Sequence, residues 1–171
     1  MNPELNKVLD ILDEIETAML TTRRADGHLV SRAMATQARA AGADIWFVTA
    51  DGSAKLDEIA GDSHVNLTYY NESTREWLSV SGTAVISRDR TTIHTLYRPD
   101  WSIWFPADAA DARYGTADDP RMVLIGISVA AATYLEVNKP RPVVLFELVK
   151  GWLTGSTPEL GEMHHLGPGG A

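Results

Sequence analysis

Alternating apolar and polar positions predict that much of this chain forms β-strands with one buried face. In the segment 64–71, Val65, Leu67 and Tyr69 fall on the same face. The segment 75–87 has the same two-residue period. Gly82 interrupts it and predicts a bulge or a close backbone approach. Further strands are predicted over residues 18–23, 29–37 and 44–49.

A period of three to four residues predicts helices between these strands. The first covers residues 3–16, with Leu5, Val8, Leu9, Leu12 and Ile15 on one face. Ser53 is placed to cap a short helix over residues 54–60, because serine is favoured at helix starts. Two more helices are predicted over residues 90–98 and near 142–153.

The run from Met122 to Val137 is almost entirely apolar and needs separate treatment. It is shorter than the ~20 residues that cross a bilayer as a helix. Gly126, Ser128 and Thr133 interrupt it. We therefore predict two buried strands joined over residues 128–132 rather than a membrane span.

Six or seven strands joined mostly by short turns predict a mainly β, α+β fold, namely a small antiparallel barrel with flanking helices. The length of 171 residues suits one compact domain. No internal repeat or linker divides the chain. We predict one domain over residues 1–160 and a flexible tail over residues 161–171, which ends in Gly167-Pro168-Gly169-Gly170-Ala171.

Composition narrows the function classes. The net charge of −8 argues against a nucleic-acid binder, which usually carries a basic surplus. The chain has no cysteine, which excludes disulfides, thiolate metal sites and cysteine nucleophiles and fits a reducing cytoplasm. The start, Met1-Asn2-Pro3-Glu4, shows no basic and apolar leader, so no signal peptide is expected.

The familiar catalytic patterns are also missing from the sequence. The five histidines form no pair at the spacing of zinc ligands on a helix, so a metal site is not expected. Ser79 and Ser81 flank Val80 within a predicted strand and not in a sharp nucleophile turn. No Walker loop or Gly-x-Gly-x-x-Gly motif occurs, and no catalytic residue is assigned.

A candidate phosphate site lies where the strand ending at Thr49 leads through a Gly-containing turn into the helix that starts after Ser53. The first N–H groups of a helix lack partners and carry the positive end of its dipole, so they attract anions. Ser53 and Lys55 add a hydroxyl and an ammonium group at this point. We predict that the strand of Arg32 pairs with the strand ending at Thr49, and Arg32 can then reach them, because paired strands lie ~5 Å apart. In the alternative interpretation, Ser53 only caps the helix, Lys55 is solvated and Arg32 pairs with Asp51.

Three longer segments, taken in order, resemble the FMN-binding split barrels related to pyridoxamine 5'-phosphate oxidase. They are Ser31-Arg32-Ala33-Met34, Phe47-Val48-Thr49-Ala50-Asp51-Gly52-Ser53-Ala54-Lys55 and Trp77-Leu78-Ser79-Val80-Ser81-Gly82-Thr83-Ala84. Three shorter ones resemble the general stress protein branch of that family: Trp104-Phe105-Pro106, Asp119-Pro120 and Tyr134-Leu135-Glu136. Each motif is short, so the order and spacing of the set carry the resemblance, which covers roughly residues 5–160.

The resemblance implies a six- to seven-stranded antiparallel split β-barrel that forms a homodimer with two FMN sites at the subunit interface. Arg32, Ser53 and Lys55 would hold the FMN phosphate. Ala33, Met34, Val48 and Thr49 would line the flavin. Trp77 stands where the oxidases have a polar flavin contact, and Trp104 would cover the ring, with core or dimer packing as the alternative role of both tryptophans.

Two features of the C-terminal part bear on the activity that the resemblance implies. The oxidases grip pyridoxal phosphate through a C-terminal Arg-x-His motif, which residues 149–165 lack, so true pyridoxamine phosphate oxidation is not expected. Some split-barrel relatives bind haem through a histidine loop near the C-terminus, and His164-His165 invites that comparison, although adjacent histidines in a tail are more often only tail.

The resemblance therefore suggests an FMN-dependent oxidoreductase that passes electrons between a reduced donor and a small acceptor, since the cofactor supplies this chemistry without an acid–base pair. The first alternative is a flavin-binding stress protein without turnover, acting as an FMN store or sensor. The second is the same fold with a different ligand, either the deazaflavin F420 or haem.

Overall fold

The structure, a computed structural model, describes residues 3–137 and 161–167. The elements in chain order are α1 (Pro3–Ile15), β1 (Thr17–Arg23), β2 (Leu29–Ala35), β3 (Ile45–Ala50), α2 (Ala54–Gly61), β4 (His64–Tyr70), β5 (Trp77–Ser87), α3 (Arg90–Leu96), the 3-10 helix η1 (Pro99–Ile103), β6 (Met122–Glu136) and β7 (Glu162–Leu166). The predicted mainly β, α+β architecture is confirmed. None of the helices among these residues is long and apolar enough to cross a membrane.

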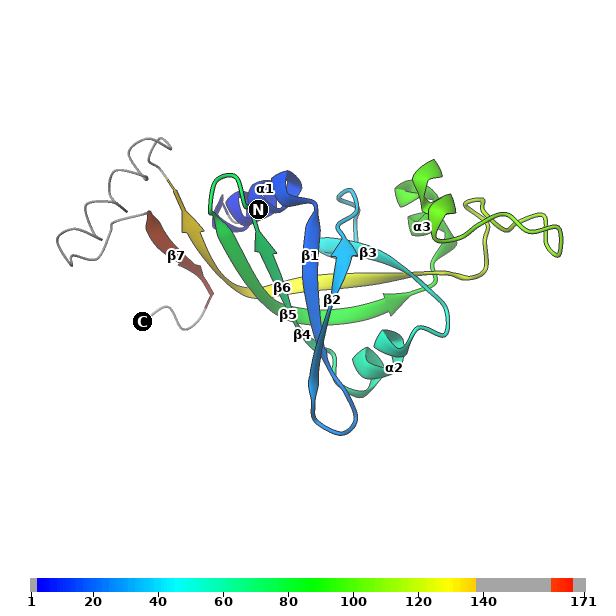
Figure 1. The fold of residues 1–171 in the computed structure, drawn as a ribbon, viewed down its shortest axis with the longest axis horizontal. Helices are drawn as coiled ribbons and strands as arrows, with labels where there is room; N and C mark the ends of the chain where they lie inside the picture. Colours follow the sequence, from blue (N-terminus) through cyan, green and yellow to red (C-terminus); the bar gives the residue numbers. More distant parts are fainter. Residues whose placement is uncertain (1–2, 138–160, 168–171) are drawn as a thin grey trace.

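Seven strands form one sheet in the order β2-β1-β4-β5-β6-β3, with β7 added to β6, and every pair is antiparallel. Figure 1 shows the sheet strongly twisted, with α1 beside the start of β1 and α2 beside the hairpin of β1 and β2. The two edge strands, β2 and β3, approach without forming a ladder. A backbone hydrogen bond from the Gln37 amide to the Trp46 carbonyl, 2.8 Å long, links the segments at this point.

The strand of Arg32 was predicted to pair with the strand ending at Thr49, and this is wrong. β2 pairs with β1, and β3 pairs with β6. A short hairpin makes β1 and β2 natural neighbours, because Gly27 adopts the positive φ of 87° that such a turn requires. Arg32 still approaches α2, because the curled sheet brings its two edges together.

The interior of the barrel is apolar, and β3 is buried on both faces. Phe47 and Ile45 enter the barrel core with Leu20, Leu67 and Leu78. Trp46, on the opposite face of the same strand, packs with Ile93, Trp101, Phe105 and Leu124 in a second cluster. This second cluster holds α3 and η1 against the outside of the barrel, beside the gap between β2 and β3.

The apolar run from Met122 forms a single 15-residue strand, which corrects the prediction of two strands joined over residues 128–132. The small residues there mark a bulge and not a turn. Ser81 pairs with Ala131 and Gly82 pairs with Val129, so Ala130 is the extra residue. The predicted role of Gly82 is confirmed, because a Cβ at this position would lie 2.3 Å from the Ser128 carbonyl oxygen.

Residues 162–166 form β7, which corrects the prediction of a flexible tail for this part of the segment 161–171. Beyond Ile127 the edge of β6 is no longer covered by β3, and β7 pairs with residues 132–136 of that free edge. His164 stacks on the Tyr134 ring at 4.9 Å, and Leu166 is buried. The helix predicted near 142–153 and the last four residues lie outside the described part of the chain.

Candidate functional site

A cavity of about 900 Å³ lies at the gap between β2 and β3, bounded by the start of α2 and by η1. This is within the range of ~300–1,000 Å³ that is usual for small-molecule sites. Its walls contain eight of the nine residues predicted to bind a cofactor: Arg32, Ala33, Met34, Val48, Thr49, Ser53, Lys55 and Trp104. Trp77 is not among the lining residues.

The polar end of the cavity is built around the ammonium group of Lys55. Its Nζ donates hydrogen bonds to the Ser53 hydroxyl at 2.6 Å and to the Thr49 hydroxyl at 2.8 Å. Ser53 is the N-cap residue of α2, yet its side chain makes no hydrogen bond to the helix backbone. The serine therefore faces the lysine and the cavity, and it does not cap the helix in the way that the alternative interpretation required.

Lys55 carries a positive charge that is poorly compensated. It makes no ion pair within residues 3–137 and 161–167, where its hydrogen-bond partners are the two neutral hydroxyls. Burial, and then the nearby Arg32 guanidinium, lower the pKa of Lys55, and Glu58 opposes them only in part. An anion bound here would relieve this cost, because opposite charge favours the protonated form of lysine.

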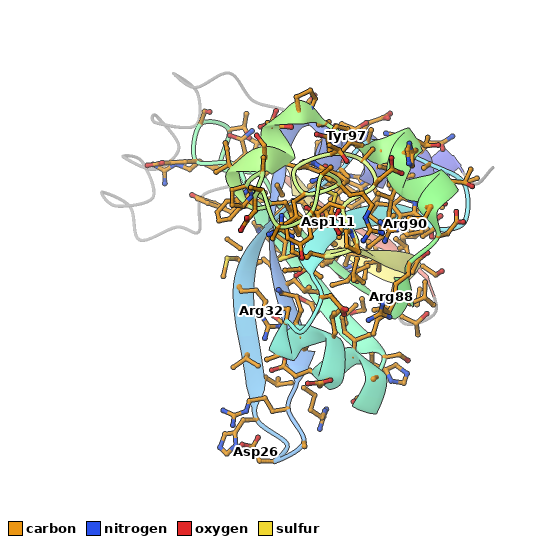
Figure 2. All side chains as sticks on the ribbon, turned by 90° about the vertical axis from the view of Figure 1, so that its right-hand side faces the viewer. Asp26, Arg32, Arg88, Arg90, Tyr97 and Asp111 are labelled. Atoms are coloured by element: carbon orange, nitrogen blue, oxygen red, sulfur yellow. The ribbon has the colours of Figure 1, made fainter. Side chains whose placement is uncertain are left out.

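Arg32 projects from the edge strand β2 toward the inner side of the sheet. Its Nη2 atom donates to Glu58 Oε2 on α2 at 2.7 Å, and its Nη1 atom donates to the buried hydroxyl of Thr22. Figure 2 shows Arg32 beside α2 and apart from Arg88. The proposed pairing of Arg32 with Asp51 is wrong, because Asp51 accepts from Arg88 at 2.7 Å.

The remaining walls of the cavity combine apolar side chains with the charged residues Asp13, Glu16, Arg39, Arg98 and Asp100. Ala33 and Met34 from β2 and Val48 from β3 line the cavity from the two sides of the gap. The Nε1 atom of the buried Trp101 donates to Gln37 Oε1 at 2.9 Å and fixes η1 over this end. Trp104 follows η1 at the rim, with 77% of its surface exposed. A flat, apolar molecule with an anionic end fits this arrangement of walls and charges.

Trp77 lies at the start of β5, paired with Tyr70 on β4 and Leu135 on β6. These strands are in the middle of the sheet, whereas the cavity lies between its two edges. A contact between Trp77 and a ligand in this cavity is therefore not made within one chain.

The structure adds two residues that the sequence reasoning missed. Glu58 and Thr22 hold the Arg32 guanidinium, and Thr22 also donates to Glu58 Oε2 at 2.5 Å. Glu58 follows Lys55 by three residues, so helical spacing places both side chains on one side of α2. That signal was present in the sequence, whereas the approach of Thr22 depends on the folded sheet.

The described residues contain no arrangement of side chains typical of a metal site. No group of three or more His, Asp or Glu side chains there is arranged to hold a metal ion. His164 and His165, which prompted the comparison with haem-binding relatives, lie on β7 and do not line the cavity.

Comparison with known proteins identifies the family. Residues 3–159 match the family model described as pyridoxamine 5'-phosphate oxidase like. The chain belongs to this family. It is 30% identical over 169 residues to Protein bli-3 of Neurospora crassa, across 97% of this chain and 80% of that protein.

Solved structures of similar fold include several stress proteins. One from Jannaschia sp. CCS1, assigned to general stress protein 26, has a TM-score of 0.72 at 23% identity and covers 98% of this chain and 99% of its own. The general stress FMN/FAD binding protein of Xanthomonas citri has a TM-score of 0.63 at 23% identity, across 81% of this chain and 92% of its own. A pyridoxamine 5'-phosphate oxidase-related, FMN binding protein of Nostoc punctiforme has a TM-score of 0.65 at 14% identity, with 97% of each chain covered. At these identities the likeness shows the split-barrel fold.

Proposed function

We propose that this protein is an FMN-binding flavoprotein of the general stress protein type. The observation that carries the proposal is the incompletely compensated charge of Lys55, held with Ser53 and Thr49 at the wall of the cavity between β2 and β3. The start of α2 adds backbone N–H groups and the positive end of the helix dipole. The Xanthomonas protein is described as FMN/FAD binding and the Nostoc protein as FMN binding, which supports a flavin as the ligand.

The residues present fit the parts of FMN. Lys55, Ser53 and the start of α2 would bind the phosphate, with Arg32 as the second cation. The guanidinium has five N–H donors, so it can bind a phosphate oxygen while it keeps Glu58 and Thr22. Ala33, Met34, Val48 and Thr49 would line the flavin ring, and Trp104 would cover it at the rim.

We further propose a homodimer with one FMN at each end of its interface. The outer face of the sheet supports this, because its middle carries no charged side chain. Two rows of directly paired residues cross it: Ser31, Thr21, Asn66, Ser81 and Ala131, and then Ala33, Met19, Thr68, Ser79 and Thr133. Charged residues are depleted in the same way at the centres of protein interfaces. Trp77 would then reach the cavity of the second subunit.

The proposed activity is electron transfer between a reduced donor and a small acceptor. The bound flavin would supply the hydride and electron chemistry, and the protein would bind it, orient it and exclude water. No histidine or tyrosine lines the cavity in the described residues; its carboxylates are those of Asp13, Glu16 and Asp100, and we assign a catalytic role to none of them. The absence of cysteine supports a cytoplasmic location, and the net charge of −8 argues against nucleic acid as a partner.

The test begins with the absorption spectrum of the purified protein and the mass of the released ligand. We expect a two-band flavin spectrum and the mass of FMN. The double variant Arg32→Ala/Lys55→Ala should lose most FMN affinity, because each charge-assisted contact contributes ~1.5–3 kcal/mol, or roughly 10- to 150-fold in Kd. Unchanged affinity in the double variant would refute the phosphate assignment, and a colourless protein that also ignores added FMN would refute the flavin itself.

The absence of histidine and tyrosine from the described lining of the cavity also suits a protein that stores or senses FMN without turnover. Reduction assays separate the two functions. Rapid bleaching of the bound flavin by NADH or NADPH supports an oxidoreductase. Tight FMN binding with no reduction by either donor supports the store or sensor, and the ligand mass separates FMN from F420 or haem.

A further inference from the structure

Glu58 is a largely buried acid beside the two cations of the candidate site, Arg32 and Lys55. Its side chain is 12% exposed, and its Oε2 atom accepts from Arg32 Nη2 at 2.7 Å and from the Thr22 hydroxyl at 2.5 Å. A carboxylate is not expected within reach of a phosphate site unless it serves the cations there, because it repels the phosphate.

The three side chains come from three different elements. Thr22 lies on β1, Arg32 on β2 and Glu58 on α2, and the threonine hydroxyl also accepts from Arg32 Nη1. The arginine is therefore held at two of its nitrogen atoms from two directions, by a helix and by a neighbouring strand. An arginine on an edge strand would otherwise lose rotamer freedom on binding a ligand, which weakens binding.

The charges around Glu58 maintain its ionised form. Burial alone would raise the pKa of Glu58, but hydrogen bonds from Thr22 and Arg32 and the charges of Arg32 and Arg24 hold it below its ordinary value. Lys55, one turn earlier on α2, also interacts with this carboxylate, which partly offsets the lowering of the lysine pKa. Glu58 thus remains an acceptor for Arg32 at neutral pH.

We propose that Glu58 is a positioning residue that presents Arg32 to the phosphate group of the cofactor, with Thr22 as the second support of the same guanidinium. This inference rests on the proposed FMN site. Glu58 does not touch the ligand, and its effect on binding passes through Arg32. An Arg32 without Glu58 keeps its charge but loses the orientation that points its remaining N–H donors into the cavity.

The experiment is a double-mutant cycle on FMN affinity, measured by quenching of flavin fluorescence in the full-length protein. The variants are Glu58→Ala, Arg32→Ala and the two together. We expect Glu58→Ala to weaken FMN binding about tenfold, the scale of one charge-assisted contact. In the Arg32→Ala background the same change should alter affinity by no more than about twofold.

Two conservative variants separate positioning from folding. Glu58→Gln keeps an acceptor oxygen for Arg32 and Thr22 and removes the repulsive charge, so it should bind FMN at least as tightly as the wild type. Glu58→Asp keeps the charge but withdraws the carboxylate by one methylene, so it should weaken binding only when Arg32 is present. These two variants keep the cycle interpretable even if Glu58→Ala does not fold.

The outcomes distinguish the two proposals. If Glu58→Asp lowers FMN affinity equally with and without Arg32, Glu58 acts only by holding α2 against the sheet. That result would overturn the positioning role. Weaker binding by Glu58→Gln than by Glu58→Asp would overturn it as well, because the charge and not the acceptor position would then matter. A wild-type protein that does not bind FMN would refute the proposed function itself.

Discussion

The buried charge of Lys55 lowers stability, and we propose that the same charge serves ligand binding. The fold buries its ammonium group among hydroxyls and near Arg32, which lowers its pKa below 10.5. A base whose pKa is lowered by folding binds more protons in the unfolded state. Between the lowered value and 10.5, the free energy of unfolding therefore rises with pH as this charge is lost.

The variant Lys55→Met removes this dependence. We expect its free energy of unfolding, relative to that of the wild-type apoprotein, to be highest near neutral pH and to fall as the pH rises toward 10.5. Its FMN affinity should be lower than that of the wild type by roughly 10- to 150-fold. Urea unfolding of both proteins across this pH range, without FMN, measures the first effect.

Lys7 provides a matched control of opposite sign. The hydrogen bond and charge of Glu136 raise the pKa of this exposed lysine. The stabilisation by Lys7 is present below pH 10.5 and is lost as the pH rises through the raised pKa. The decrease in the free energy of unfolding caused by Lys7→Met should therefore become smaller as the pH increases. Parallel pH profiles for the two variants would contradict our account of Lys55.

Eight of the nine residues predicted from the sequence to bind a cofactor line the cavity, and several of their positions depend on local structure. Ser53 and Lys55 are fixed by where α2 starts, and helix starts have a sequence signature. The contact of Arg32 with Glu58 was not predicted, because these residues come from elements that only the folded sheet brings together. The pairing of Arg32 with Asp51 failed for the same reason, since Arg88 reaches Asp51 from the far end of β5.

At the scale of elements, β6 determines how the sheet is assembled. It pairs with β5 along nearly its whole length, with β3 over its first part and with β7 over its last part. An apolar period cannot distinguish a bulge from a turn, because both place small residues in the middle of the run. The single strand was therefore missed, although Gly82 on the neighbouring strand gave the position of the irregularity.

Gly82 should be intolerant of any side chain. Its missing Cβ would lie 2.3 Å from the Ser128 carbonyl oxygen and 3.1 Å from Ile127 Cγ2, at the bulge where β5 and β6 change register. Gly82→Ala should lower the free energy of unfolding by ~1–3 kcal/mol, the usual cost of overpacking. Chemical denaturation of the apoprotein measures this loss directly.

Gly61 is the control for this substitution. It is exposed at the end of α2, and a Cβ there meets nothing within 4 Å. Gly61→Ala should leave stability unchanged or raise it by up to about 1 kcal/mol, because alanine is the better helix former. A loss for Gly61→Ala as large as that for Gly82→Ala would mean that the close approach to Ser128 is not the cause.

At the scale of the whole molecule, the twisted sheet has an inner face that encloses the barrel core and an outer face on the opposite side. The inner face buries the apolar core, and the cavity lies where β2 and β3 fail to pair. The strand order could not be derived from periodicity, since the same pattern fits several antiparallel orders. The family resemblance supplied the split barrel, because the spacing of several motifs constrains topology more than any single element does.

The outer face of the sheet is the proposed dimer interface, and Ser81 lies near the middle of this face. This exposed serine is directly paired with Asn66 and Ala131, in the uncharged rows of the outer face. Ser81→Arg would place a bulky charge where two flat faces meet, at a cost that an uncharged interface cannot offset by pairing. We expect the wild-type protein to sediment as a dimer and the variant to shift toward the monomer.

The same variant tests whether the cofactor site needs the second subunit. If Trp77 contacts the flavin, it does so from the partner chain, so the monomeric variant should also bind FMN more weakly although Arg32, Ser53 and Lys55 are untouched. Ala110→Arg, in the exposed loop before β6, adds the same charge away from the sheet and should change neither property. A Ser81→Arg protein that sediments as a monomer and keeps full FMN affinity would show that one chain forms a complete site, and the interface location of the cofactor would then be wrong.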